Sequence, residues 1–319
     1  MKALRLANFL VVVFVVHGCN LDVPVDELDV IEYDNFMIYS DLSSRMGNNP
    51  SDTLIINQII DFFVSDCVKP GIKVNDRSAI SFSRVNYRRS NCPSSKIDIG
   101  LISNLEEKQQ FVNNKNDLKN LGKAILDFKG SVSCNYSESD YGGLDLISLI
   151  HQELNTGNHI KEPGYLIGET DTTTLYYHNH LFVFTDGYLE YSTSDGAKGL
   201  YYGEEKIEEL REFCLAFKVS PEDAIRENDR FQLRPLVSES NRLVNLYILE
   251  TDDRGFNVKR GTLKNAGELS DNNLLRLVWK VWAEESGFAH FEWRAITRAT
   301  NLPADFIQKL LHRQVITDP

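Results

Sequence analysis

Apolar segments with the character of buried strands alternate along this chain with segments that have a helical pattern. The strongest strand candidate is Leu-Phe-Val-Phe-Thr at residues 181–185, whose composition predicts burial on both faces of a sheet. Parallel strands need a long connection between them, and a helix supplies it in βαβ units. The alternation therefore predicts an α/β fold: a Rossmann-like open, mostly parallel sheet that helices cover on both faces.

The expected elements follow from the period of the apolar residues and from end signals. Strands are expected at residues 36–39, 78–85, 97–102, 181–185 and 243–249. Helices are expected from Ser51 onward and at residues 105–128, 144–154, 207–217 and 274–283. Residues 293–300 and 305–311 are amphipathic and predict two further helical segments at the C-terminus.

These elements are expected to form one domain over residues 35–285, followed by a short helical C-terminal extension at residues 286–319. The extension is too short for a core of its own, so we expect it to pack on the domain. Hydrophobic residues make up 42% of the chain and charged residues 25%, as in folded globular proteins. The formal net charge of −12 excludes the basic electrostatic footprint of a nucleic-acid-binding protein.

The N-terminus has the organisation of an export signal. Lys2 and Arg5 precede an unbroken apolar run at residues 9–16, which is too short to span a bilayer comfortably and favours a cleaved signal. Cys19 follows a glycine just after this run, an arrangement that resembles a bacterial lipobox. The resemblance implies that residues 1–18 are a lipoprotein signal peptide and that Cys19 carries the lipid.

Residues 19–34 are then an acidic, lipidated tether. We expect an exported protein that is lipid-anchored in the bacterial cell envelope, on its periplasmic or surface face. Only the N-terminal lipid would touch the membrane. An ordinary secretory signal with an incidental cysteine is the alternative that the sequence leaves open.

Four cysteines follow the predicted signal, and an exported chain enters a compartment where disulfides form. Cys92 and Cys134 lie in polar, loop-like stretches, and we expect them to pair. Cys214 lies in an apolar helical pattern and is expected to be a buried free thiol. The sequence contains no Cys-x-x-Cys or Cys/His spacing typical of zinc sites.

Polar residues follow two of the expected strands directly. Asp41-Leu-Ser-Ser-Arg45 follows the first strand, and Thr185-Asp186-Gly187 follows the strongest central strand. Open α/β sheets bind ligands at the carboxyl ends of their strands. These two segments are therefore the main candidates for a binding site.

At this point the chain resembles the von Willebrand factor A-type domain, whose first strand ends in Asp-x-Ser-x-Ser and a later strand in Thr-Asp-Gly. Two further stretches are similar to the family: Asp76-Arg-Ser-Ala-Ile-Ser-Phe-Ser83, which looks like its second strand, and Gly142-Gly-Leu-Asp145, which looks like its Gly-Gly-Thr-Asp turn. The resemblance covers about residues 35–283. It implies a metal-ion-dependent adhesion site for Mg²⁺ or Mn²⁺, hard dications that prefer oxygen ligands.

Carried over residue by residue, the resemblance places Asp41, Ser43 and Asp186 at ligand positions of this ion, with Asp145 as a substitute ligand. The chain departs from the pattern at Arg45, which replaces the second serine, and at Leu144, which replaces the threonine. Leucine has no ligand atom, and a guanidinium repels a dication.

Three interpretations of this site remain open. In the first, Asp41, Ser43 and Asp186, with Ser44 or Asp145, hold a dication weakly through extra waters. In the second, Arg45 pairs with Asp41 or Asp186 and takes the place of the ion. In the third, Arg45 points into solvent and the segment is a simple turn.

Three other patterns have both a functional and a structural explanation. His178 and His180 are two residues apart and therefore point to the same face of a strand. This spacing allows metal ligation, but it is also expected of polar histidines at the edge of a buried strand. Trp279 and Trp282, three residues apart, predict a buried helix face. Asp-Asp-Arg-Gly at residues 252–255 follows a further strand, and either joins the same rim or forms a turn.

The function that these residues favour is binding of a protein or cell-envelope partner at the strand ends. Its expected contacts are Asp41, Ser43, Ser44, Arg45 and Asp186. A structural scaffold lipoprotein with an inert metal site is the alternative. A metal-dependent hydrolase or phosphotransferase comes third, because the chain has no nucleophile elbow, phosphate loop or His-Glu-x-x-His motif.

Overall fold

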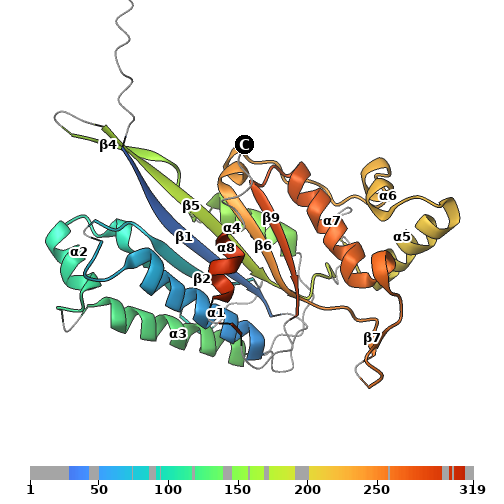
Figure 1. The fold of residues 1–319 in the computed structure, drawn as a ribbon, viewed down its shortest axis with the longest axis horizontal. Coiled ribbons are helices and arrows are strands. Elements are labelled where there is room, and N and C mark those ends of the chain that lie inside the picture. The colour runs from blue at the N-terminus through green and yellow to red at the C-terminus, as the bar shows by residue number, and fades with distance from the viewer. Residues whose placement is uncertain are drawn as a thin grey trace, which may run out of the picture.

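A computed structural model of the chain describes residues 29–42, 50–73, 75–85, 91–93, 95–116, 119–138, 146–156, 159–168, 172–190, 201–257, 259–296, 302–303 and 305–312. Within these residues the chain forms a mostly parallel, seven-stranded sheet with helices on both faces (Figure 1). The fold class expected from the alternation of strands and helices is therefore confirmed.

The strands of the large sheet are β1 (Val30–Asp41), β2 (Ala79–Val85), β3 (Ser95–Asp98), β4 (Gly164–Ile167), β5 (Thr172–Phe184), β6 (Val244–Thr251) and β9 (His290–Ala295). A separate hairpin contains β7 (Phe256–Asn257) and β8 (Thr262–Leu263). The α-helices are α1 (Pro50–Phe62), α2 (Leu105–Val112), α3 (Leu121–Ser137), α4 (Leu146–Thr156), α5 (Glu204–Phe217), α6 (Pro221–Glu227), α7 (Asp271–Glu285) and α8 (Phe306–His312).

The strand order is β3-β2-β1-β5-β6-β9, with β4 beside β5. β1 is parallel to both β2 and β5, and β6 is parallel to β5 and β9. β3 and β4 are antiparallel to their neighbours. The chain runs from β1 through β2 to β3 at one edge of the sheet, and β5 then lies on the other side of β1. The order therefore reverses between β1 and β5, where doubly wound sheets have their ligand crevice.

Two hydrophobic cores lie on opposite faces of the sheet because successive strand residues point to opposite faces. Phe182 and Phe184 of β5 belong to the core beneath α1, α3 and α8. Leu181 and Val183 belong to the core beneath α4, α5 and α7. The central strand is thus buried on both faces, as its composition predicts.

β9 corrects the expectation of a helix at residues 293–300 over its described part, residues 293–296. His290–Ala295 forms an edge strand parallel to β6, and its Phe291 and Trp293 pack against the second of these cores. The segment alternates polar and aromatic residues, which is the period of a strand and not of a helix. Residues assigned to a C-terminal extension thus supply a strand of the central sheet. α8 overlaps the second expected helix, at residues 305–311, and ends one residue after it.

Other boundaries also differ from expectation. The single helix expected at residues 105–128 is two helices, α2 and α3, each with an asparagine N-cap at Asn104 or Asn120. The strand expected at residues 97–102 ends at Asp98 and continues as a 3₁₀ turn. β1 begins at Val30, so the last residues of the expected tether belong to the sheet.

A disulfide joins Cys92 to Cys134, the pair expected from the polar stretches around them. It links the segment after β2 to α3. Cys214 is buried and free, also as expected, and so is Cys67. Cys19 and the expected signal at residues 1–18 lie outside the described residues. Among the described helices, none is long and apolar enough to span a bilayer.

Candidate functional site

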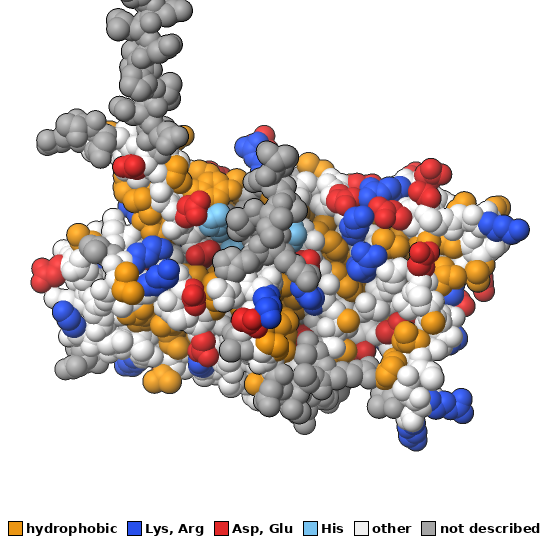
Figure 2. Space-filling model, in the orientation of Figure 1, with side chains coloured by type: hydrophobic (Ala, Val, Ile, Leu, Met, Phe, Trp, Pro, Cys, Tyr) orange, Lys and Arg blue, Asp and Glu red, His pale blue; other side chains and the backbone are white. Residues whose placement is uncertain are grey.

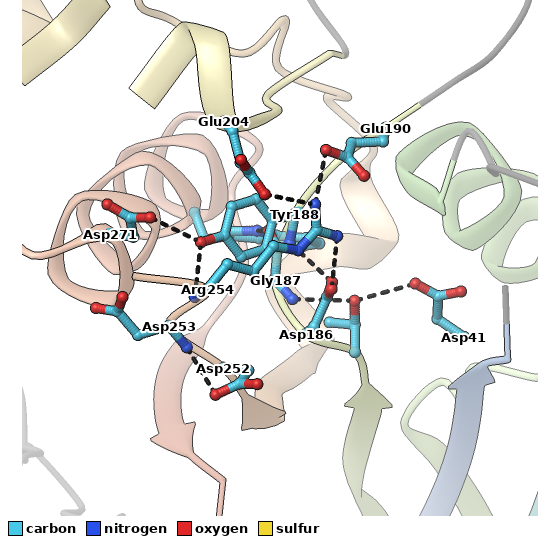
Figure 3. Close-up of polar contacts among 12 residues, drawn as sticks. Asp41, Asp186, Gly187, Tyr188, Glu190, Glu204, Asp252, Asp253, Arg254 and Asp271 are labelled. Carbon is cyan, nitrogen blue, oxygen red and sulfur yellow. Dashed lines mark hydrogen bonds and ion pairs between the residues drawn. The ribbon is translucent and has the colours of Figure 1, made fainter. Parts of the chain in front are cut away.

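The carboxyl ends of β1, β5 and β6 meet at one edge of the sheet, next to the N-termini of α5 and α7 (Figure 3). We call this edge the strand-end rim. Its residues are Asp41, Thr185, Asp186, Glu190, Glu204, Asp252, Asp253, Arg254 and Asp271. It contains two of the residues expected at the site, Asp41 and Asp186, and the segment after β6 that was expected either to join it or to form a turn.

The ends of β1 and β5 are joined by a buried hydrogen-bond chain. The Thr185 hydroxyl donates to Asp41 Oδ2 (3.1 Å) and accepts from the Gly187 N–H (3.2 Å). Gly187 has a φ of +92°, and a Cβ there would lie 2.7 Å from the Trp293 ring. Only glycine fits this turn, because a side chain would meet both a strained backbone and an aromatic ring.

Arg254 occupies the centre of the rim (Figure 3). Its guanidinium binds Asp186 Oδ2 at 2.9 Å and Glu190 Oε1 at 2.8 Å, and lies 3.4 Å from Glu204 Oε1. It also stacks on Tyr188, with Cζ 4.0 Å from the ring centroid. One arginine thus connects the segment after β5, the segment after β6 and the start of α5.

The electrostatic environment keeps Arg254 charged. Burial alone would lower the pKa of Arg254, but its hydrogen bond to Glu190 and the charge of Asp186 outweigh burial and raise the pKa above its ordinary value. The arginine is therefore a fixed positive charge, and it neutralises only part of the surrounding negative charge.

A second arginine extends the network toward α5 and α7. The Tyr188 hydroxyl donates to Asp271 Oδ2 (3.0 Å), and the buried Arg211 binds the other oxygen of the same carboxylate. Arg211 also binds Glu208. Asp271 lies in the first turn of α7, where a negative charge is favourable to the helix dipole.

Acidic side chains outnumber basic ones around these two arginines. The carboxylates in this network and beside it belong to Asp186, Glu190, Glu204, Glu208, Asp252, Asp253 and Asp271. Burial, with the nearby Asp271, raises the pKa of Asp253 above its ordinary value. The rim therefore has an excess of negative charge that Arg211 and Arg254 do not balance.

The described members of the expected metal site, Asp41 and Asp186, are engaged by groups of the chain itself. The two oxygens of Asp186 bind the Tyr188 N–H and Arg254, whose guanidinium would repel a dication at that carboxylate. One oxygen of Asp41 accepts from Thr185. Within the part of the chain that the structure describes, no three His, Cys, Asp or Glu side chains are grouped to hold a metal.

Four expected site residues, Ser43, Ser44, Arg45 and Asp145, lie outside the described residues, so their roles remain predictions. The arginine that does bind Asp186 is Arg254, which the sequence analysis placed in a turn or at the rim without a partner.

Two buried carboxylates near the rim were missed. Glu250 has a positive φ of 62°, and its carboxylate accepts from the hydroxyl of Ser51 at the start of α1 (2.6 Å). Asp52, in the next position of α1, accepts from Tyr136. Nothing local in the sequence indicates the turned backbone at Glu250, which coincides with an irregular register between β6 and β9.

His178 and His180 lie away from the rim, in the middle part of β5. Figure 2 shows histidine side chains near the middle of the face that carries α1, α3 and α8. His180 is buried, with Nε2 3.4 Å from Asp34 and Nδ1 3.3 Å from the Tyr247 hydroxyl. His178 lies 3.4 Å from Glu32. These contacts support the structural explanation of the two histidines.

His180 gives the fold an expected acid sensitivity. Burial lowers the pKa of His180 from 6.5 and outweighs the opposite effect of Asp34. Cys67, His178 and His290 are the other titratable groups near the pair of His180 and Asp34. Below about pH 6.5 the unfolded chain binds a proton at His180 that the folded chain excludes. The free energy of unfolding is therefore expected to fall on acidification, by at most about 1.4 kcal/mol per pH unit for this one group.

Urea denaturation at pH 7 and pH 5 measures this dependence. His180→Gln, which cannot titrate but still offers Asp34 a donor, is expected to show a smaller loss between the two pH values. Burial raises the pKa of Asp34, but the hydrogen bond and charge of His180 outweigh burial and lower this pKa below 3.8. The stability that Asp34 contributes is therefore lost only at a pH below that value. An unchanged loss in His180→Gln would assign the acid sensitivity to other groups.

A scan against protein-family models finds no match to this chain, and a search of curated proteins finds none either.

Proposed function

We propose that this chain is an exported, lipid-anchored protein of the bacterial cell envelope with a von Willebrand factor A-like body, and that its strand-end rim binds a protein partner. The mostly parallel sheet with helices on both faces is compatible with such a body. The lipobox-like cysteine supports the anchor. The position of the rim, where the strand order reverses, supports the choice of binding site.

The single observation that carries the proposal is the Arg254 cluster, which consists of Arg254 and the carboxylates of Asp186, Glu190 and Glu204. Its carboxylates come from separate segments, and two of them reach the surface: the side chains of Glu190 and Glu204 are 38% and 62% exposed. Arg254 holds these acidic groups in fixed positions, which lowers the entropy cost of binding. The surplus negative charge suits a partner with lysine or arginine side chains.

Arg254 also replaces the ion of the expected adhesion site in this proposal. A dication in the family would attract a partner's carboxylate. Here a guanidinium beside Asp186 organises the rim, and the exposed carboxylates make the contact. The partner chemistry is therefore opposite in charge to that expected from the resemblance.

A structural scaffold is the second candidate, because Arg254 connects the segment after β6 to carboxylates after β5 and at the start of α5. In that case the cluster would serve only to connect β5, β6 and α5, and other surfaces would bind the partner. The two candidates differ in whether the exposed carboxylates of the rim affect binding.

Photo-crosslinking in the native cell separates them. Tyr201, which is 43% exposed and adjoins the rim, is replaced by benzoylphenylalanine, a change of similar shape. We expect a discrete crosslinked product whose yield falls about tenfold in Glu190→Gln/Glu204→Gln, because the contacting charges are lost. The matched control Glu205→Gln/Glu212→Gln removes the same charge from exposed positions of α5 outside the Arg254 cluster.

Equal yields from both variants would contradict rim binding and favour the scaffold. Fractionation of the same cells tests the anchor separately. Wild type is expected in the membrane fraction and Cys19→Ser in the soluble fraction. A Cys19→Ser chain that stays with the membrane would contradict the lipid anchor without affecting the rim result.

A further inference from the structure

A groove lies at the β3 edge of the sheet, at the end of the strand order opposite to β9. Its volume is about 430 Å³, in the range of about 300–1,000 Å³ that ligand pockets occupy. β3 and α3 supply most of its lining residues, with Phe111 from α2. This groove is separate from the strand-end rim and plays no part in the function proposed above.

The floor of the groove is apolar. Ile97 of β3 is buried, and Ile102, Phe111 and Ala124 are partly exposed around it. Such a floor favours an apolar side chain over water, because burial of apolar area is stabilising.

Exposed lysines line the groove on two of its walls. Lys96 comes from β3, Lys119 precedes α3 and Lys123 lies in the first turn of α3. Neither Lys119 nor Lys123 forms an ion pair with another residue that the structure describes. Of the two aspartates in the lining, Asp98 is neutralised by Lys161 at 2.7 Å and by Lys96 at 3.4 Å.

A second aspartate, Asp127, is exposed on α3, so the lysines still exceed the acidic groups. This local surplus of positive charge contrasts with the net charge of −12 of the whole chain. A ligand that satisfies both the floor and the lysines must carry negative charges on either side of an apolar group.

We propose that this groove binds an acidic segment of a partner protein, with an apolar side chain on the floor and flanking carboxylates at Lys96, Lys119 and Lys123. A peptide places carboxylates on both sides of its apolar residue, whereas an amphiphile with one headgroup reaches the lysines on one side only. Charge complementarity therefore favours a peptide over a fatty acid.

Fluorescence anisotropy with the full-length chain tests the proposal. The probe is a fluorescein-labelled peptide of sequence Asp-Glu-Leu-Phe-Glu-Asp. We expect saturable binding that weakens from low to high salt, because the Debye length shortens. Two control peptides, Asn-Gln-Leu-Phe-Gln-Asn and Asp-Glu-Ser-Ser-Glu-Asp, lack the charges or the apolar residues, and each is expected to bind at least about tenfold more weakly.

Variants locate the binding on the chain. Lys119→Glu/Lys123→Glu is expected to weaken probe binding at least about tenfold, because two attractive contacts become repulsive. Lys259→Glu/Lys264→Glu makes the same charge change in the β7–β8 hairpin and should leave the dissociation constant unchanged. Ala124→Trp fills the floor without changing any charge and should also weaken binding.

Three results would overturn the proposal. One is the absence of saturable probe binding up to about 1 mM, the affinity limit of a useful contact. Another is an equal effect of the two lysine pairs, which would mean attraction by overall charge. The third is binding of sodium decanoate, sensitive to Ala124→Trp, without binding of the peptide, which would make the groove an amphiphile site. None of these results bears on the rim.

Discussion

Replacing Trp279 by alanine is expected to lower the free energy of unfolding by about 3–5 kcal/mol, the range for a fully buried tryptophan. Trp279 is completely buried in the core beneath α4, α5 and α7 and packs edge-to-face on Trp282, with ring centroids 5.4 Å apart. Its truncation would leave a large cavity between α7 and the sheet. Urea denaturation followed by far-ultraviolet circular dichroism measures the change.

The same substitution reaches the strand-end rim. The Trp279 indole N–H donates to the Gly187 carbonyl at 2.9 Å, and this carbonyl would be left buried without that donor. Trp279→Phe keeps a six-membered aromatic ring but loses this bond and leaves a smaller cavity, so an intermediate loss of about 1–3 kcal/mol is expected. Leu126→Ala, on an exposed residue of α3, is the surface control and should change stability by less than about 0.5 kcal/mol.

A loss below about 1 kcal/mol in Trp279→Ala would contradict the placement of this ring in the core. A loss in Trp279→Phe equal to that in Trp279→Ala would show that the part specific to the indole dominates. The comparison thus separates the part of the loss specific to the indole, its N–H and second ring, from the rest of the cavity.

Removal of the disulfide is expected to have a similarly large effect. Cys92 and Cys134 are 42 residues apart in sequence, and the chain-entropy treatment of a loop of this length gives about 4 kcal/mol. The bond restricts the unfolded chain between β2 and the end of α3. In the folded state the same segment is also held by the Ser131 hydroxyl, which donates to the Pro93 carbonyl at 2.6 Å.

Cys92→Ser/Cys134→Ser is the test variant, measured by the same denaturation. A reductant should destabilise the wild-type chain by a comparable amount and leave the double variant unchanged, since Cys67 and Cys214 are buried and free. If the reductant leaves the free energy of unfolding of the wild-type chain unchanged, the two cysteines are not joined in the purified protein.

The sequence itself determined the fold class. A strand as apolar as residues 181–185 needs cover on both faces, and the helical segments between strands supply that cover. The same reasoning placed Asp41 and Asp186 at one edge, because parallel strands end together. The pairing of Trp279 and Trp282 on a buried helix face followed from their spacing alone. These features depend on neighbours within one turn or one strand, where composition and period are informative.

Other features depended on contacts between distant segments. Arg254 meets Asp186 across 68 residues, and no spacing rule indicates which arginine a strand-end aspartate will bind. The strand β9 was mistaken for a helix because its alternation is short and its partner, β6, lies some 40 residues earlier in the chain. Glu250 meets Ser51, 199 residues earlier, at a place where the register between β6 and β9 shifts.

The physical reason is that local patterns decide burial and period, whereas ion pairs and backbone irregularities depend on the tertiary arrangement. The sequence by itself thus determined that this chain folds as an open α/β sheet with polar residues at its strand ends. Only the tertiary structure decided that a guanidinium lies against Asp186. That position is energetically favourable because carboxylates from separate segments surround Arg254, a convergence that exists only once the sheet has formed.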